Sequence, residues 1–180
     1  DCVYCECGWN SEGRSDHKMP TVEQVREALK SKLIECHRDN IPVDSITFSG
    51  NGEPTLHPDF PEIIDYTVAL RDELFPKAVI SVLSNATMLG RPGVKEALRK
   101  IDNPILKLDG VDEDYVRLID RPQNPNYSID EVISHLEWFK GDFILQTMFL
   151  RGVVDGVEVD SMRKDLLEGW QKMVIALHPR

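Results

Sequence analysis

Short apolar segments alternate with amphipathic helices along the chain, and this alternation constrains the fold more than any other feature. The segments with the composition of strands are 45–49, 78–84, 105–108 and 143–150. The segments with helical periodicity are 21–39, 58–74, 94–100, 113–119, 128–139 and 162–177. Strict alternation of buried strands with helices is the pattern of a parallel sheet with right-handed crossovers. The sequence therefore predicts an α/β fold.

Two of the expected helices begin with a capping box, in which a hydroxyl side chain precedes Gln or Glu by three residues. These pairs are Thr21 with Gln24 and Ser128 with Glu131. Cys36 lies on the apolar face of the first helix, so it is expected to pack in the core rather than to carry chemistry.

Three cysteines stand within six positions at the start of the chain. Cys2 and Cys5 have the C-x-x-C spacing, which lets one short loop present two thiolates to one metal centre, and Cys7 adds a third sulfur. The spacing does not resemble a secreted disulfide scaffold. Metal or redox chemistry is the leading interpretation, and a structural zinc or iron site that also uses His17 is an alternative.

Composition excludes several classes of protein. The 180 residues carry 21 Lys and Arg against 31 Asp and Glu, a net charge of −10, which argues against unspecific binding to a phosphate backbone. The chain has no apolar run long enough to cross a bilayer and no signal-peptide pattern at its start, so we expect a cytoplasmic protein.

The first strand is followed by Gly50, Asn51, Gly52 and Glu53. Two glycines let backbone groups approach a ligand closely, and the carboxylate of Glu53 suits an ammonium group. Ligand sites of parallel α/β sheets lie at the carboxyl ends of the strands, where this stretch falls. A simple turn remains an alternative, because Gly- and Asn-rich turns after strands are common.

The next two strands also end in polar residues. Ser84 and Asn85 offer short hydrogen-bonding groups that suit sugar hydroxyls, although they also suit a turn. Lys107 and Asp109 alternate along the third strand, so their side chains share one face. Opposite charges among apolar residues are costly unless they are paired or bind something, which favours a functional role.

These stretches occur in the order found in one family. The chain resembles a radical SAM enzyme over essentially its whole length, and is similar in particular to the iron–sulfur oxidoreductase branch that includes wyosine-forming tRNA enzymes. Residues 47–56 are its most specific stretch. The resemblance implies a single radical SAM core domain over 1–180, a partial parallel (β/α)6 TIM-like barrel. It also implies a [4Fe–4S] cluster that cleaves S-adenosylmethionine (SAM) and so generates a 5′-deoxyadenosyl radical, which abstracts hydrogen from substrate.

The resemblance also implies roles for individual residues. Cys2 and Cys5 match the second and third cluster ligands of a C-x₃-C-x₂-C loop. The residues that match SAM-contacting positions are Tyr4, Gly50, Asn51, Gly52, Glu53, Ser84 and Asn85. Lys107 and Asp109 match the position where substrate or the SAM carboxylate is met, and are the expected catalytic pair.

The chain departs from the family pattern at its start. The first cluster cysteine is expected three positions upstream of Asp1, and Cys7 is extra to the pattern. No strand precedes the cysteine loop and none follows the last helix, so we expect a chain trimmed at both ends. A degenerate barrel acting as a binding partner is a further alternative. The expected partners are a small-molecule, peptide or tRNA substrate and an electron donor such as flavodoxin or ferredoxin, with no membrane.

Overall fold

The computed structural model describes residues 1–6, 18–50 and 52–180. Its helices are α1 (Val22–Arg38), α2 (Phe60–Leu74), α3 (Val94–Leu98), α4 (Glu113–Asp120), α5 (Ile129–Glu137) and α6 (Lys164–Leu177). Its strands are β1 (Ser45–Phe48), β2 (Val79–Ser84), β3 (Asn103–Lys107), β4 (Ile144–Gln146), β5 (Arg151–Val154) and β6 (Val157–Asp160). A short 3₁₀ helix covers Pro54–Leu56.

The first four strands form one parallel sheet in the order β1-β2-β3-β4. In the β1–β2 pair, Ser45 lies opposite Val79 and Phe48 opposite Val82. Helices separate β1 from β2, β2 from β3 and β3 from β4 along the chain, as the crossover connections of parallel strands require. The predicted α/β class and the parallel sheet of a partial TIM-like barrel are confirmed. Within the described residues the strands form an open sheet and do not close into a barrel.

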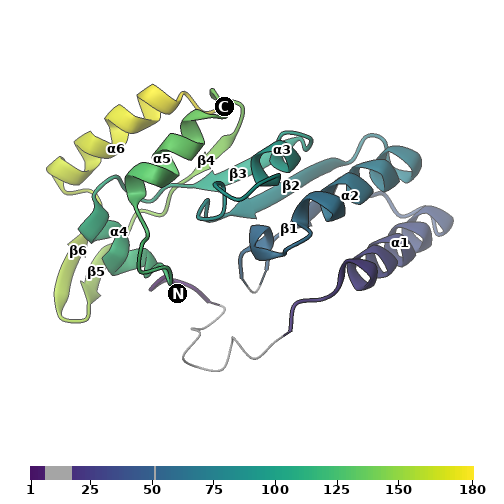
Figure 1. Ribbon diagram of the computed structural model, residues 1–180, viewed down its shortest axis with the longest axis horizontal. Helices are drawn as coiled ribbons and strands as arrows, with labels where there is room; N and C mark the ends of the chain where they lie inside the picture. The colour runs from purple at the N-terminus through teal and green to yellow at the C-terminus, as the bar shows by residue number, and fades with distance from the viewer. Residues whose placement is uncertain (7–17, 51) are drawn as a thin grey trace. The chain divides into compact units, whose positions relative to one another are not determined.

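The chain divides into two compact units. One unit comprises 18–84 and 88–105, and here α1 packs against α2 (Figure 1). The capping box at Thr21 and Gln24 is present, and Cys36 is buried as predicted. The predicted apolar stripe of α2 is buried in full: Phe60, Ile63, Ile64, Thr67 and Leu70.

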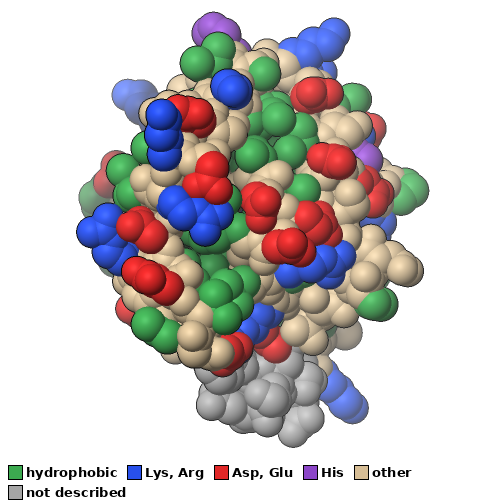
Figure 2. Space-filling model, turned by 90° about the vertical axis from the view of Figure 1, so that its left-hand side faces the viewer, with side chains coloured by type: hydrophobic (Ala, Val, Ile, Leu, Met, Phe, Trp, Pro, Cys, Tyr) green, Lys and Arg blue, Asp and Glu red, His purple; other side chains and the backbone are tan. Residues whose placement is uncertain are grey.

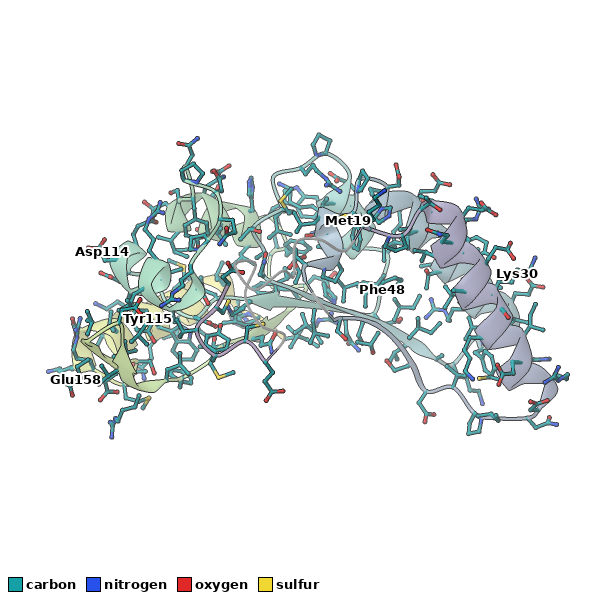
Figure 3. The ribbon with its side chains drawn as sticks, turned by 90° about the horizontal axis from the view of Figure 1, so that it is seen from below. Met19, Lys30, Phe48, Asp114, Tyr115 and Glu158 are labelled. Carbon is teal, nitrogen blue, oxygen red and sulfur yellow. The ribbon has the colours of Figure 1, made fainter. Side chains whose placement is uncertain are left out.

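The other unit comprises 85–87, 106–180 and the described residues at the start of the chain. The helix α4 begins where the Asp112 carboxylate accepts a hydrogen bond from Tyr115 N at 2.8 Å. Asp114 is exposed, whereas the neighbouring Tyr115 is buried, so one face of α4 points into the unit (Figure 3). The predicted buried stripe of 128–139 is also present: Ile129, Val132, Ile133, Leu136 and Phe139.

The region between α5 and α6 differs from the sequence prediction. The single strand expected over 143–150 is only three residues long, and it is followed by an antiparallel hairpin of β5 and β6, strands that were not predicted. Asp155 and Gly156 join the hairpin strands with φ of 50° and 80°. Two consecutive positive φ values match a type I′ turn, whose twist fits a two-residue hairpin. Asp-Gly between β-branched residues is the sequence signal for this turn.

Charged side chains of both signs are mixed over the face shown in Figure 2, where Lys and Arg do not gather into one patch. No helix in the described part of the chain combines the length and the apolar character that a membrane span requires.

Burial predicts which substitutions destabilise the fold. We expect Ile133→Ala to lower the free energy of unfolding by about 3 kcal/mol, because it removes buried apolar surface and leaves a cavity. Ile175→Ala is the matched control in the same unit: Ile133 is 7% exposed and Ile175 is 75% exposed. The control is expected to change the free energy by less than about 0.5 kcal/mol. Urea denaturation measures both, and equal losses would contradict the packing described.

Candidate functional site

The two described cysteines of the first loop lie on one turn. Cys5 N donates a hydrogen bond to Cys2 O at 3.0 Å, and both cysteines are partly exposed. Val3 N donates to Ile119 O at 2.8 Å, which fastens the turn to the end of α4. The predictions for Cys7 and His17 lie outside the described residues.

Lys107, the last residue of β3, has its ammonium group beside this turn. Its Nζ lies 3.0 Å from Asp109 Oδ2, donates to Asp120 Oδ1 at 2.5 Å and donates to Cys2 Sγ at 3.4 Å. The same nitrogen lies 4.9 Å from the centre of the Tyr4 ring, within the range of a cation–π contact. The structure therefore brings together the predicted Lys107, Asp109, Tyr4 and Cys2.

Asp109 is fully enclosed, since none of its side-chain surface is exposed. Its carboxylate accepts hydrogen bonds from the Tyr4 hydroxyl and from Met148 N, the latter at 3.0 Å. The Tyr4 hydroxyl also lies 2.9 Å from Asp120 Oδ1. These contacts link the cysteine turn, the end of β3, the end of α4 and the segment after β4.

Burial and charge act together on the titration of these groups. Burial lowers the pKa of Lys107, but the carboxylates of Asp120 and Asp109 outweigh it, so the pKa is raised and the group stays charged. Burial, followed by the charge of Asp120, raises the pKa of Asp109, because two carboxylates share one ammonium. Burial, aided by the charges of Asp120 and Asp109, strongly raises the pKa of Tyr4, which keeps the phenol as a hydrogen-bond donor.

The stretch after β1 forms a second cluster, in the unit that contains 18–84. Gly50 and Gly52 have φ of 135° and 139°, values that favour glycine, and Gly52 N donates to Gly50 O at 2.7 Å. Asn51 lies outside the described residues. Among the described residues, no atom lies within 4 Å of the place that a Cβ would take at either glycine, so a ligand can approach this backbone closely.

Glu53 and Ser84, predicted separately, are in direct contact. Glu53 Oε1 accepts hydrogen bonds from Ser84 Oγ at 2.8 Å, Thr55 Oγ1 at 2.5 Å and Thr55 N at 3.1 Å. All three residues are buried, so the carboxylate is held in one orientation. Asn85 follows, and its Oδ1 accepts hydrogen bonds from Thr87 N and Oγ1 at 3.0 and 2.7 Å, the turn that had been the alternative interpretation.

Asp120 and Thr55 were not predicted as site residues. Asp120 lies just beyond the helix expected over 113–119, but in the structure it is the last residue of α4, four positions after the buried Val116. A carboxylate on the apolar side of a helix was the signal that could have identified it. Thr55 lies within the most specific stretch of the sequence, but a lone threonine carries no signal of its own.

The described residues fit an iron–sulfur cluster as part of its ligand set. Among them, no three His, Cys, Asp or Glu side chains converge on a site that could hold a metal ion alone. Cys2 and Cys5 place two thiols on one turn, and thiolates are the usual ligands of iron–sulfur clusters. The chemistry of the donors thus agrees with a cluster of which this turn supplies two ligands.

The sequence of the chain is similar to those of known proteins. The model of the radical SAM superfamily matches residues 1–168. A UPF0026 protein of Helicobacter pylori strain J99 is 26% identical over 177 residues, covering 93% of this chain and 53% of the relative. A UPF0026 protein of Synechocystis is 32% identical and covers 84% of this chain and 54% of the relative. A GTP 3′,8-cyclase of Corynebacterium glutamicum is 31% identical over 74% of this chain and 34% of its own. The chain spans about half the length of the UPF0026 relatives.

The enclosure of Asp109 leads to a prediction about stability. Asp109→Ala removes one of the two carboxylates that Lys107 and Tyr4 share and leaves Met148 N without this acceptor, so we expect a loss of about 2–3 kcal/mol in the free energy of unfolding. Asp65→Ala is the matched control, because it breaks an exposed ion pair with Lys100 whose N–O distance is 2.5 Å. The control is expected to cost at most about 1 kcal/mol. Equal losses in thermal or urea unfolding would show that the buried network contributes no more than a surface pair.

Proposed function

The chain belongs to the radical SAM superfamily, and on that premise we propose that it forms the core of an enzyme that binds a [4Fe–4S] cluster and SAM. When bound, these groups supply one-electron reductive cleavage of SAM and hydrogen abstraction from a substrate. The observation that carries the proposal is the C-x-x-C turn, whose Cys2 thiol contacts a buried network of charged side chains.

In this proposal Cys2 and Cys5 bind the cluster iron, and Tyr4 packs beside the SAM adenine. Lys107, whose side chain is 15% exposed, presents its positive charge to the carboxylate of SAM or of the substrate while its N–H donors stay with Asp109, Asp120 and Cys2. Asp109 has no exposed side-chain surface, and we assign it to orienting Lys107 and Tyr4.

The second cluster has the chemistry to receive the amino group of SAM. Gly50, Asn51 and Gly52 supply backbone groups, and the carboxylate of Glu53 supplies a negative charge for the ammonium group. The hydrogen bonds from Thr55 and Ser84 hold that carboxylate in place before ligand binds, which reduces the entropy lost on binding. Asn85 is proposed to contact the ribose together with Ser84.

The substrate is proposed only by class: a small molecule, a peptide or a tRNA. The electron comes from a reductant such as flavodoxin or ferredoxin, and the reaction takes place in the cytoplasm. The mixed surface in Figure 2 and the net charge of −10 favour a small molecule or peptide over direct binding of tRNA by this part of the protein.

Anaerobic reconstitution of the full-length protein with iron and sulfide tests the proposal. We expect bound iron and sulfide and, after reduction with dithionite, methionine and 5′-deoxyadenosine formed from SAM. Cys2→Ser and Cys5→Ser are expected to abolish product formation, whereas Cys36→Ala, which alters a buried cysteine of α1, retains it. Stoichiometric zinc without sulfide would indicate a structural metal module, and no bound metal would indicate a degenerate barrel. Either result overturns the proposal.

The role of Glu53 is testable by SAM binding alone. We expect Glu53→Gln to weaken SAM binding roughly 10- to 100-fold, because a hydrogen bond to a charged group contributes about 1.5–3 kcal/mol. Glu62→Gln on α2 is the matched control, since Glu62 is 60% exposed and pairs with Arg26. Isothermal titration calorimetry on the reconstituted protein measures both, and equal affinities for the two variants would remove Glu53 from the site.

A further inference from the structure

The ammonium group of Lys107 has three N–H donors and three acceptors around it. Two acceptors are the carboxylates of Asp109 and Asp120, and the third is the Cys2 sulfur at 3.4 Å. An ammonium whose donors are all assigned has one preferred orientation. The bond to sulfur is therefore set by the two carboxylates, not by chance contact of a flexible side chain.

Further contacts of the cysteine turn and of the two carboxylates stabilise this arrangement. The backbone bond from Val3 to Ile119 fixes the cysteine turn, and the Tyr4 hydroxyl contacts both carboxylates. Lys107 and Asp120 are 15% and 17% exposed at their side chains, so water competes little for these bonds. A positive charge fixed beside a cysteine sulfur in a low-dielectric environment acts strongly on any charge carried by that sulfur.

From this geometry, and resting on the proposed function, we propose that Lys107 is a positioning residue for Cys2 that also raises the reduction potential of the cluster, and that Asp120 opposes this effect. Hydrogen bonds to cluster sulfurs and nearby charge are main determinants of cluster potential. A donated N–H and a positive charge favour the reduced, more negative state. The Asp120 carboxylate draws the ammonium away from sulfur and adds negative charge, so it favours the oxidised state.

The alternative is that the network only holds the chain together. In that case the loss of either Lys107 or Asp120 breaks the same ion pair, and both losses act in the same direction on stability. In an electrostatic role, the loss of Lys107 and the loss of Asp120 shift the cluster potential in opposite directions, because the two residues carry opposite charges. The sign of the change in potential therefore separates the two roles.

The experiment is a redox titration, followed by electron paramagnetic resonance, of the reconstituted full-length protein and its variants. We expect Lys107→Met to shift the midpoint potential to more negative values and Asp120→Asn to shift it to more positive values. Lys107→Arg, which keeps the charge and the donors, is expected to restore most of the wild-type potential. Lys100→Met is the control: it removes a lysine from an exposed ion pair with Asp65 and is expected to leave the potential unchanged.

The outcomes separate this inference from the proposed function. Failure of the wild-type protein to bind a cluster defeats the proposed function. If the wild-type protein binds a cluster, two results overturn this inference alone. One is an Asp120→Asn cluster with the wild-type potential, and the other is a shift of the potential in the same direction in Asp120→Asn and Lys107→Met. If Lys107→Met does not retain a cluster, a positive shift in Asp120→Asn with a near-wild-type potential in Lys107→Arg supports the inference, and any other combination overturns it.

Discussion

One buried ammonium group, that of Lys107, holds the candidate site together. It is shared between the carboxylates of Asp109 and Asp120 and reaches the sulfur of Cys2. A charge in this environment is costly unless every donor has a partner, so the four segments that supply the partners must come together. The position of the cysteine turn depends on this constraint, since Cys2 contacts Lys107 and Tyr4 contacts Asp109 and Asp120, in addition to the bond from Val3 to Ile119.

Much of the fold could be predicted from the sequence because its signals are local. The apolar stripe of α2 and the hydroxyl caps at Thr21 and Ser128 follow from residues three or four positions apart. The region after α5 could not be predicted as well, because 143–150 is apolar apart from Gln146 and Thr147 and apolar residues continue beyond the end of β4. The Asp155-Gly156 pair was a readable signal for a hairpin turn, but strands on either side of it were not predicted.

Some residues of the candidate site could likewise be predicted from the sequence, and others could not. The glycines and Glu53 were identifiable because they stand together after one strand, and the structure adds that Thr55 and Ser84 hold the carboxylate. The contact between Tyr4 and Asp109 spans 105 positions in the sequence, so no local pattern could reveal it. Asp120 carried a local signal, its place on the apolar side of α4, but its role depends on Lys107 and Tyr4, which come from other segments.

The central claim is that the cysteine turn binds an iron–sulfur cluster that interacts directly with SAM. The most direct test is the electron paramagnetic resonance spectrum of the reduced full-length protein, recorded with and without SAM. The account predicts a signal from a reduced [4Fe–4S] cluster whose shape changes when SAM is added. A reconstituted protein that shows no cluster signal, or a cluster signal that SAM leaves unchanged, would contradict it.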